Sequence, residues 1–176
     1  YGIGQEFFRR NQWETAVRYF RDALAANPQH FRARLRLGET LIHLSRSADA
    51  VVELEWAYRQ DRDEARLSLV RALVAQARTL EQAGDENGAL AACERALQIS
   101  PGDPAAQKIR AGIIMRRGEM DARIHERAGR WAEAAALYGQ LAGYAGDDES
   151  RERWKTAAER CQKEQDLARL FREGME

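Results

Sequence analysis

The stretch Asn11–Pro28 reads NQWETAVRYFRDALAANP and decides the fold of the chain. Ala16, Phe20 and Ala23 are three or four positions apart, so they lie on one face of an α-helix. Pro28 ends this helix, because proline cannot continue a helix and the residue before it disfavours the α conformation. The stretch predicts an amphipathic helix that presents small residues on either side of one large residue.

The same arrangement recurs three times further along the chain. The alanines that begin the four copies are Ala16, Ala50, Ala89 and Ala134, with spacings of 34, 39 and 45 residues. A turn-like segment precedes each copy, and another helical segment precedes each turn. Two antiparallel helices pack closely only where a small residue lies at their contact, and one such hairpin cannot bury its own apolar face. The recurrence predicts stacked helical hairpins.

The repeated positions fall into two kinds, namely small residues at helix contacts and larger residues or prolines beside them. In the first two copies they are Gly4, Ala16, Phe20, Ala23 and Pro28, then Gly38, Ala50, Leu54 and Ala57. In the last two copies they are Ala89, Cys93, Ala96 and Pro101, then Ala134 and Tyr138.

These residues and spacings resemble the tetratricopeptide repeat (TPR) family, closely over residues 1–103 and more loosely over 115–148. Trp13 and Trp131 stand where the family commonly has an aromatic residue after the turn. The third copy departs from the pattern, because Gln76–Ala77 replaces the usual Leu–Gly pair. The resemblance implies an all-α fold, a right-handed α-solenoid of stacked antiparallel helical hairpins.

The spacing of 45 residues predicts lengthened helices in the C-terminal half. Eleven residues beyond the usual 34 add about three helical turns and keep the apolar face in register. We therefore expect one helix over Pro104–Ala128, with Asp103 as its N-cap, and another from about Asp148 to Glu173. The apolar stripe of the first is predicted to be Ile109, Ile113, Met120, Ile124 and Ala128.

The domain expected from these units is a single repeat domain over residues 1–176. Its predicted units are 1–30, 31–64, 65–103 and 104–147, and a final helix 148–175 opens a further unit. The chain starts at Tyr1 and ends in LFREGME, which resembles the opening of another unit. A fragment of a larger protein is therefore expected.

The composition excludes several classes of partner. The chain has 28 Lys plus Arg and 28 Asp plus Glu, so no excess charge favours a nucleic acid or a membrane surface. It has no apolar run of 18 residues and no signal-peptide pattern. We expect a cytoplasmic protein, with nucleic acid as an improbable partner and no membrane partner.

No catalytic, metal or cofactor site is expected. His30, His43 and His125 are far apart and lack metal-ligand spacing. Cys93 takes the core position of Phe20, and Cys161 has no base nearby in sequence. Because no nucleophile, base and oxyanion site converge, we expect the chain not to be an enzyme.

The resemblance to the TPR family implies that the first helix of each hairpin lines a concave groove for a peptide or a partner helix. Arginines mixed with apolar residues there suit an acidic ligand with apolar anchors. The alternative is a solvated face that is rich in arginine. The residues that map onto this groove are Gln5, Phe8, Arg9, Arg32, Leu35, Arg36, Glu39, Ile42, His43, Arg71, Val74 and Arg78.

Three functions remain open at this stage. The first is a non-catalytic scaffold that binds another protein in this groove. The second is self-association or assembly through apolar faces at Tyr1–Phe8 and Leu167–Phe171. The third is RNA binding by the arginine-bearing face, which the zero net charge disfavours. Recognition of chaperone C-termini is not expected, because Tyr1, Gln5 and Glu39 replace the Lys and Asn residues of such clamps.

Overall fold

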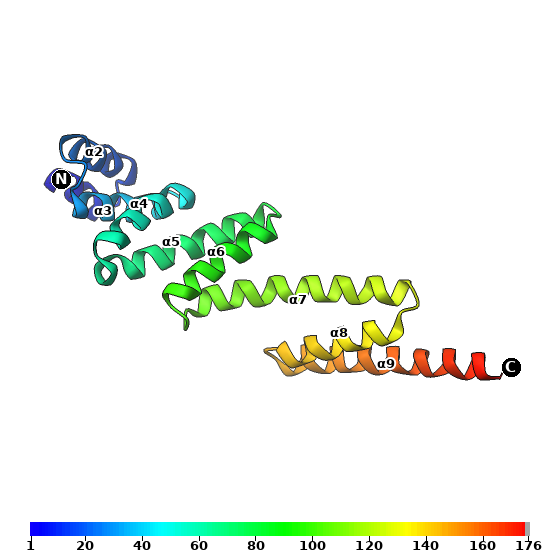
Figure 1. Cartoon of the computed structure of the whole chain (residues 1–176). Helices are drawn as coiled ribbons and strands as arrows, with labels where there is room; N and C mark the ends of the chain where they lie inside the picture. Colours follow the sequence, from blue (N-terminus) through cyan, green and yellow to red (C-terminus); the bar gives the residue numbers. More distant parts are fainter. Residues whose placement is uncertain (175–176) are drawn as a thin grey trace. The chain divides into compact units, whose positions relative to one another are not determined.

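The computed structural model describes residues 1–174, and the regular structure in these residues is entirely α-helical (Figure 1). This confirms the predicted all-α repeat fold. Met175 and Glu176, which end the LFREGME motif, lie outside the described residues. In the described range the helices are α1 (Gly2–Arg9), α2 (Trp13–Ala26), α3 (Phe31–His43), α4 (Ser47–Gln60), α5 (Arg62–Gln82), α6 (Glu86–Ile99), α7 (Pro104–Arg127), α8 (Trp131–Tyr144) and α9 (Asp148–Glu173).

The four hairpins close through the same backbone turn. In each, one residue two positions before the second helix has a left-handed conformation, with φ between 57° and 81°. The next amide donates to a carbonyl five residues earlier, as in the bond from Gln12 N to Phe7 O, at 3.0 Å. This is the pattern of a Schellman motif, which satisfies the last carbonyls of a helix. The left-handed residues are Asn11, Ser45, Gly84 and Gly129.

The predicted contacts between paired helices lie in the core. A Cβ placed on Gly4 would come within 2.8 Å of the Phe20 ring, and one on Gly38 within 2.4 Å of Leu54. Ala77 lies at the same offset of 16 residues before Cys93, and both are fully buried. The remaining repeat positions are also buried, apart from Ala23, which is half-buried, and Pro28 and Pro101, which are exposed in turns.

The two lengthened helices are present. Helix α7 runs over Pro104–Arg127, and the Asp103 carboxylate accepts a hydrogen bond from the Ala106 amide at 2.8 Å. Helix α9 runs over Asp148–Glu173, as expected from the spacing. Helix α5 begins at Arg62, inside the predicted second unit, because the Asp61 side chain caps it.

The predicted apolar stripe of α7 is wrong in its second half. Ile109 and Ile113 are buried, but Met120 and Ile124 are 66% and 45% exposed, and Ala128 is also exposed. The buried residue there is Ala122, which lies in one core cluster with Tyr138. Ala122 and Tyr138 are both buried in this cluster, so the side of the helix that is buried is set by packing against the neighbouring helices and not by the even apolar spacing.

The chain divides into two compact units, one over Tyr1–Arg110 and one from Ala111 onward, and the boundary falls within α7. The first unit has its core between α1–α2, α3–α4 and α5–α6. The core of the second unit is formed by Ala122, Ala134, Tyr138, Leu141, Ala142, Ala145, Trp154 and Cys161. None of the helices in residues 1–174 combines the length and apolar character needed to cross a bilayer.

Candidate functional site

The predicted groove residues come from α1, α3 and α5 of the first unit, and they differ in accessibility. Leu35 and Val74 are only 6% and 7% exposed, so these two expected anchors belong to the core. The other apolar members, Phe8 and Ile42, are half-buried, as are Gln5, Arg36 and Glu39. The exposed members are Arg9, Arg32, His43, Arg71 and Arg78.

Polar contacts link the three helices along this face. The guanidinium of Arg36 lies 5.3 Å from the ring centroid of Phe8, and it donates to Glu39 at 2.8 Å. Glu39 also accepts a hydrogen bond from the Ser68 hydroxyl of α5 at 2.7 Å. Arg36 and Glu39 therefore connect neighbouring helices, which reduces their availability to a ligand.

His43 has a structural contact in addition to its exposed face. Its ring stacks on Trp13 of α2, with centroids 4.1 Å apart and planes 3° apart. Phe8 approaches Trp13 edge-on at 5.2 Å. These three rings form an aromatic cluster at one end of the predicted groove.

Leu67 is a surface residue that the sequence reasoning missed. It is 67% exposed and lies one helical turn before Arg71 on α5. Its position four residues from Arg71 is the signal that could have identified it. Leu67, rather than Leu35 or Val74, offers an accessible apolar side chain beside the arginines.

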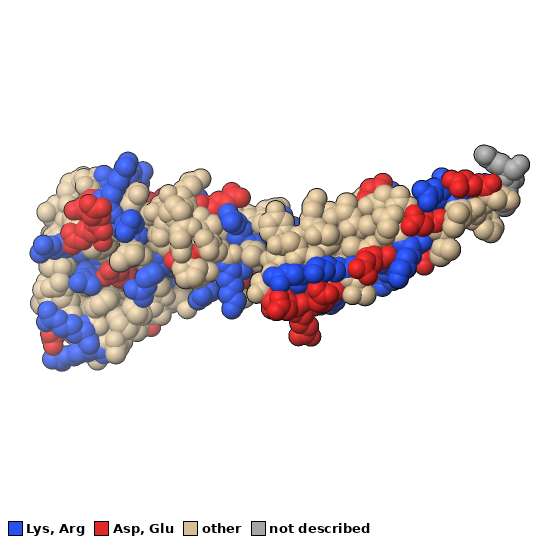
Figure 2. Space-filling view, turned by 90° about the horizontal axis from the view of Figure 1, so that it is seen from below, with Lys and Arg blue, Asp and Glu red and all other residues tan. Residues whose placement is uncertain are grey.

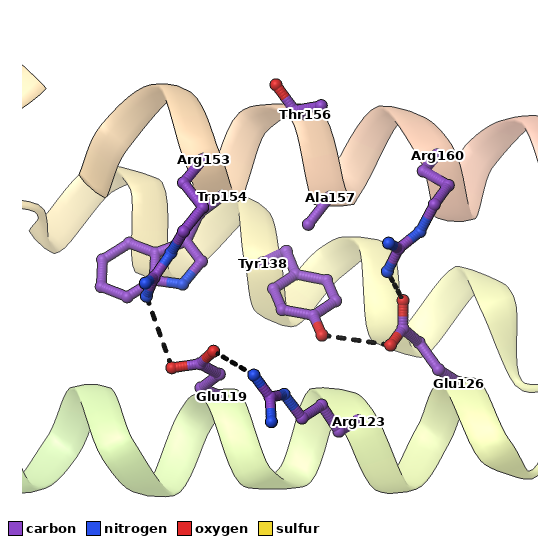
Figure 3. A pocket seen from close by; sticks show the side chains of 9 residues that line it. All are labelled: Glu119, Arg123, Glu126, Tyr138, Arg153, Trp154, Thr156, Ala157 and Arg160. Atoms are coloured by element: carbon purple, nitrogen blue, oxygen red, sulfur yellow. Dashed lines mark hydrogen bonds and ion pairs between the residues drawn. The ribbon is translucent and has the colours of Figure 1, made fainter. Parts of the chain in front are cut away.

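The second unit contains a cleft of about 510 Å³, which the sequence reasoning also missed (Figure 3). Figure 3 shows side chains from α7 and α9 that face each other across it, with Tyr138 of α8 between them. The lining residues are Glu119, Arg123, Glu126, Tyr138, Arg153, Trp154, Thr156, Ala157 and Arg160.

Two ion-pair bridges cross this cleft from α9 to α7. Arg153 lies 3.5 Å from Glu119, and Arg160 donates to Glu126 seven residues further along each helix (Figure 3). Glu119 also pairs with Arg123 of its own helix at 2.9 Å. Both bridges join residues 34 positions apart, and this repeated Glu and Arg spacing is the sequence signal for the cleft.

Glu126 is the most heavily bonded residue of the cleft. Besides Arg160, it accepts hydrogen bonds from the Tyr138 hydroxyl and the Cys161 thiol, each at 3.2 Å. Burial opposes ionisation of Glu126, but the hydrogen bonds from Cys161 and Arg160 outweigh it, so its pKa is lowered. Glu126 is therefore a carboxylate at neutral pH that ties all three helices of the unit together.

The thiol beside this carboxylate is not an activated nucleophile. Burial, followed by the hydrogen bond to Glu126, raises the pKa of Cys161 to about 11. Burial likewise raises the pKa of Cys93. Because the thiolate is the reactive form, both residues are inert thiols at neutral pH.

The histidines and acidic residues show no metal geometry. Within residues 1–174, no three His, Cys, Asp or Glu side chains are arranged to hold a metal ion. His30 caps α3 by accepting from the Ala33 amide at 3.3 Å, and His125 lies on α7. On the face shown in Figure 2, basic and acidic side chains are interspersed, which does not favour a polyanionic partner.

The family models that match the chain agree with this architecture. Sequence models described as tetratricopeptide repeat match residues 1–65, 70–103 and 122–152. The protein in a crystal structure of MamA shares 17% of its sequence with this chain, and the two folds superpose with a TM-score of 0.50. The alignment covers 94% of this chain and 97% of that chain. A thermophilic TPR protein from Thermus thermophilus is 22% identical, with a TM-score of 0.44, covering 88% of this chain and 95% of that chain. A search of curated proteins found no match.

Proposed function

We propose, from the premise that the chain belongs to the tetratricopeptide repeat family, that it is a non-catalytic module that binds another protein. Proteins of this family generally mediate protein–protein interaction and are typically non-catalytic. The binding surface in this proposal is the exposed side of α1, α3 and α5 in the first unit, which we call the first-helix surface. Its members are Gln5, Phe8, Arg9, Arg32, Arg36, Glu39, Ile42, His43, Leu67, Arg71 and Arg78.

The observation that carries this proposal is the combination of exposed arginines with an exposed leucine. Arg32, Arg71 and Arg78 are exposed, and Leu67 lies one turn from Arg71. A guanidinium can bind a carboxylate through two parallel hydrogen bonds, and leucine supplies apolar area. The expected partner is a peptide or helix that carries acidic groups beside an apolar anchor. A cytoplasmic location is part of the same proposal.

The test is capture of a partner by the full chain, followed by charge reversal on the first-helix surface. The Arg32→Glu, Arg71→Glu double variant should lose at least about tenfold in affinity, because two attractions become repulsions. Helicity and melting temperature should not change, since both side chains are exposed. The matched control is Arg18→Glu, Arg21→Glu, which makes the same charge change at exposed positions of α2. Equal binding by both double variants would contradict the proposal.

Self-association is a second candidate function. Leu167, Leu170 and Phe171 of α9 are between 58% and 70% exposed, which is unusual for neighbouring large apolar residues. Light scattering over a concentration series should then show a mass above that of one chain, and Phe171→Glu should restore the monomer. A monomer at all concentrations would exclude this candidate.

A further inference from the structure

The last part of α9 extends as a single helix beyond the turn between α7 and α8 (Figure 1). Helix α9 has 26 residues and α8 has 14, so α9 is longer by 12 residues, or about 18 Å. The ion pair of Arg160 with Glu126 lies one residue before the end of α7. Gln165 lies beside Ala132, at the start of α8. The segment 166–173, which we call the α9 extension, therefore lies past both neighbouring helices.

The α9 extension has one apolar face. Leu167, Leu170 and Phe171 are three or four positions apart, so their side chains lie on one side of the helix. They are 59%, 58% and 70% exposed. Neighbouring large apolar side chains with this exposure are typical of an interaction surface.

The second unit also has an open groove between α8 and α9, which we call the α8–α9 groove. It consists of a hollow of about 470 Å³ near the start of α8 and one of about 440 Å³ near its end. Ala158 and Glu159 of α9 line both hollows, so the two adjoin. The side of the groove that α8 forms consists of Ala132, Ala135, Ala136, Gly139, Ala142 and Gly143.

The groove and the α9 extension have complementary shapes. Within the second unit, a Cβ on Gly118 of α7 would come within 2.8 Å of Leu141 of α8, so a small residue faces a large apolar one at this helix contact. Gly139 and Gly143 have nothing within 4 Å of a Cβ built on them. They are small residues without a large apolar side chain opposite, and the α9 extension carries three such side chains.

Charged residues indicate the direction in which an extension fits the groove. Arg151 and Lys155 line only the hollow near the end of α8, whereas Glu159 also lines the other hollow. Lys163 precedes the apolar face of the extension and Glu173 follows it, and both are exposed. An extension that runs parallel to α8 brings Glu173 towards Arg151 and Lys155. The opposite direction brings Lys163 towards these two basic residues, and like charges disfavour it.

We propose that the α9 extension of one copy of this chain docks in the α8–α9 groove of a second copy. This inference rests on self-association, the second candidate function above, and names the two surfaces that would meet. Because α8 and α9 run antiparallel, an extension parallel to α8 is antiparallel to the α9 beside it. A two-fold axis then relates the copies, so each extension fills the groove of the other and the assembly closes at two chains.

The first experiment is light scattering of the full chain over a concentration series. The mass should rise from 20.0 kDa towards twice that value and then level off. Gly139→Gln, Gly143→Gln fills the groove with polar side chains and should weaken association at least about tenfold. Glutamine is a better helix former than glycine, so the variant should stay folded by circular dichroism.

The matched control is Ala25→Gln, Ala91→Gln, which places the same side chains at exposed helix positions outside the groove. It should associate as the parent chain does.

The second experiment tests the direction of docking by disulfide trapping. Glu173→Cys mixed with Gly143→Cys under oxidised glutathione should give a mixed disulfide on a non-reducing gel. Glu173→Cys mixed with Ala132→Cys should give at least about tenfold less, because Ala132 lies 11 residues, or about 16 Å, further back along α8. The native Cys93 and Cys161 are buried and should not compete.

The outcomes separate this inference from the candidate function on which it rests. If the parent chain keeps the mass of one copy at every concentration, self-association fails and the docking fails with it. If the parent chain associates and the groove variant does so equally well, self-association stands and the groove is not its site. A mass that keeps rising past two copies, or trapping that favours Ala132→Cys, would overturn the closed two-fold pair. A dominant disulfide between two Glu173→Cys chains would show that the extensions pair with each other instead.

Discussion

Gly38 of α3 lies so close to Leu54 of α4 that a Cβ at Gly38 would come within 2.4 Å of the Leu54 Cγ atom. Leu54 is fully buried, so it cannot swing out of the way. We expect Gly38→Ala to lower the free energy of unfolding by about 1–3 kcal/mol, because an added methyl group overpacks the helix contact. Chemical denaturation followed by circular dichroism measures this difference.

Gly139→Ala is the matched control for this substitution. Gly139 lies inside α8, and nothing lies within 4 Å of a Cβ built on it. Alanine is the better helix former by about 1 kcal/mol, so this variant should be as stable as the parent or more stable. If both variants changed stability equally, close packing at Gly38 would not explain its residue type.

Cys161 should react slowly with alkylating reagents in the native protein. Its pKa is raised from 9.0 to about 11 by burial and by its hydrogen bond to Glu126. A rise of two pKa units lowers the fraction of thiolate at pH 8 about 100-fold, and burial further limits the access of the reagent to the sulfur. Mass spectrometry after iodoacetamide treatment should show Cys161 unmodified under native conditions and fully modified in denaturant. Rapid native modification would show that the helices around it open readily.

Glu126 should make the stability of the second unit depend on pH. Its pKa is lowered in the folded chain relative to the ordinary value of 4.5, so the folded state favours the ionised carboxylate more than the unfolded state does. The stabilisation is therefore present above about pH 4.5 and is lost as the pH falls through the lower folded pKa. Glu126→Gln should cost about 1–2 kcal/mol at pH 7, and much less below the folded pKa.

Glu164→Gln tests whether this pH dependence is specific to Glu126. Glu164 lies on the same unit, on α9, and is exposed. Its substitution should leave the denaturation midpoint unchanged at both pH values. A parallel loss of stability in the two variants would point to net charge rather than to the bonds of Glu126.

The positions of the helices along the chain could be predicted, because they depend on the spacing of the repeated residues in the sequence. The offset of 45 residues between copies was sufficient to place α7 and α9, since added whole turns leave the packed face in register. The buried and exposed sides of the first helices could not be predicted as reliably. Helix α3 packs against α2, α4 and α5, so only a narrow strip of its surface is exposed to solvent. Leu35 lies outside this strip and is buried.

The cleft could not be predicted for a different reason. Its bridges depend on the distance and orientation of α9 relative to α7 within the second unit, which no single helix encodes. The sequence has two glutamates, each followed 34 residues later by an arginine, namely Glu119 with Arg153 and Glu126 with Arg160. This spacing can be recognised as a pairing of two helices only once the length of the hairpin is known. The Trp154 indole nitrogen is buried without a hydrogen-bond partner in residues 1–174, which is a property of packing and has no sequence signal.

Ser45→Gly should stabilise the hairpin turn between α3 and α4. Ser45 has φ 58°, and the equivalent turn positions of two other hairpins are Gly84 and Gly129. The left-handed conformation costs a residue with a Cβ about 1–2 kcal/mol, which exceeds the entropy that glycine loses on folding. The net gain in unfolding free energy should be about 0.5–1 kcal/mol, measured by chemical denaturation. The reciprocal variant Gly84→Ala should destabilise by about 1 kcal/mol. A loss of stability in Ser45→Gly would mean that the serine side chain contributes more than the backbone strain removes.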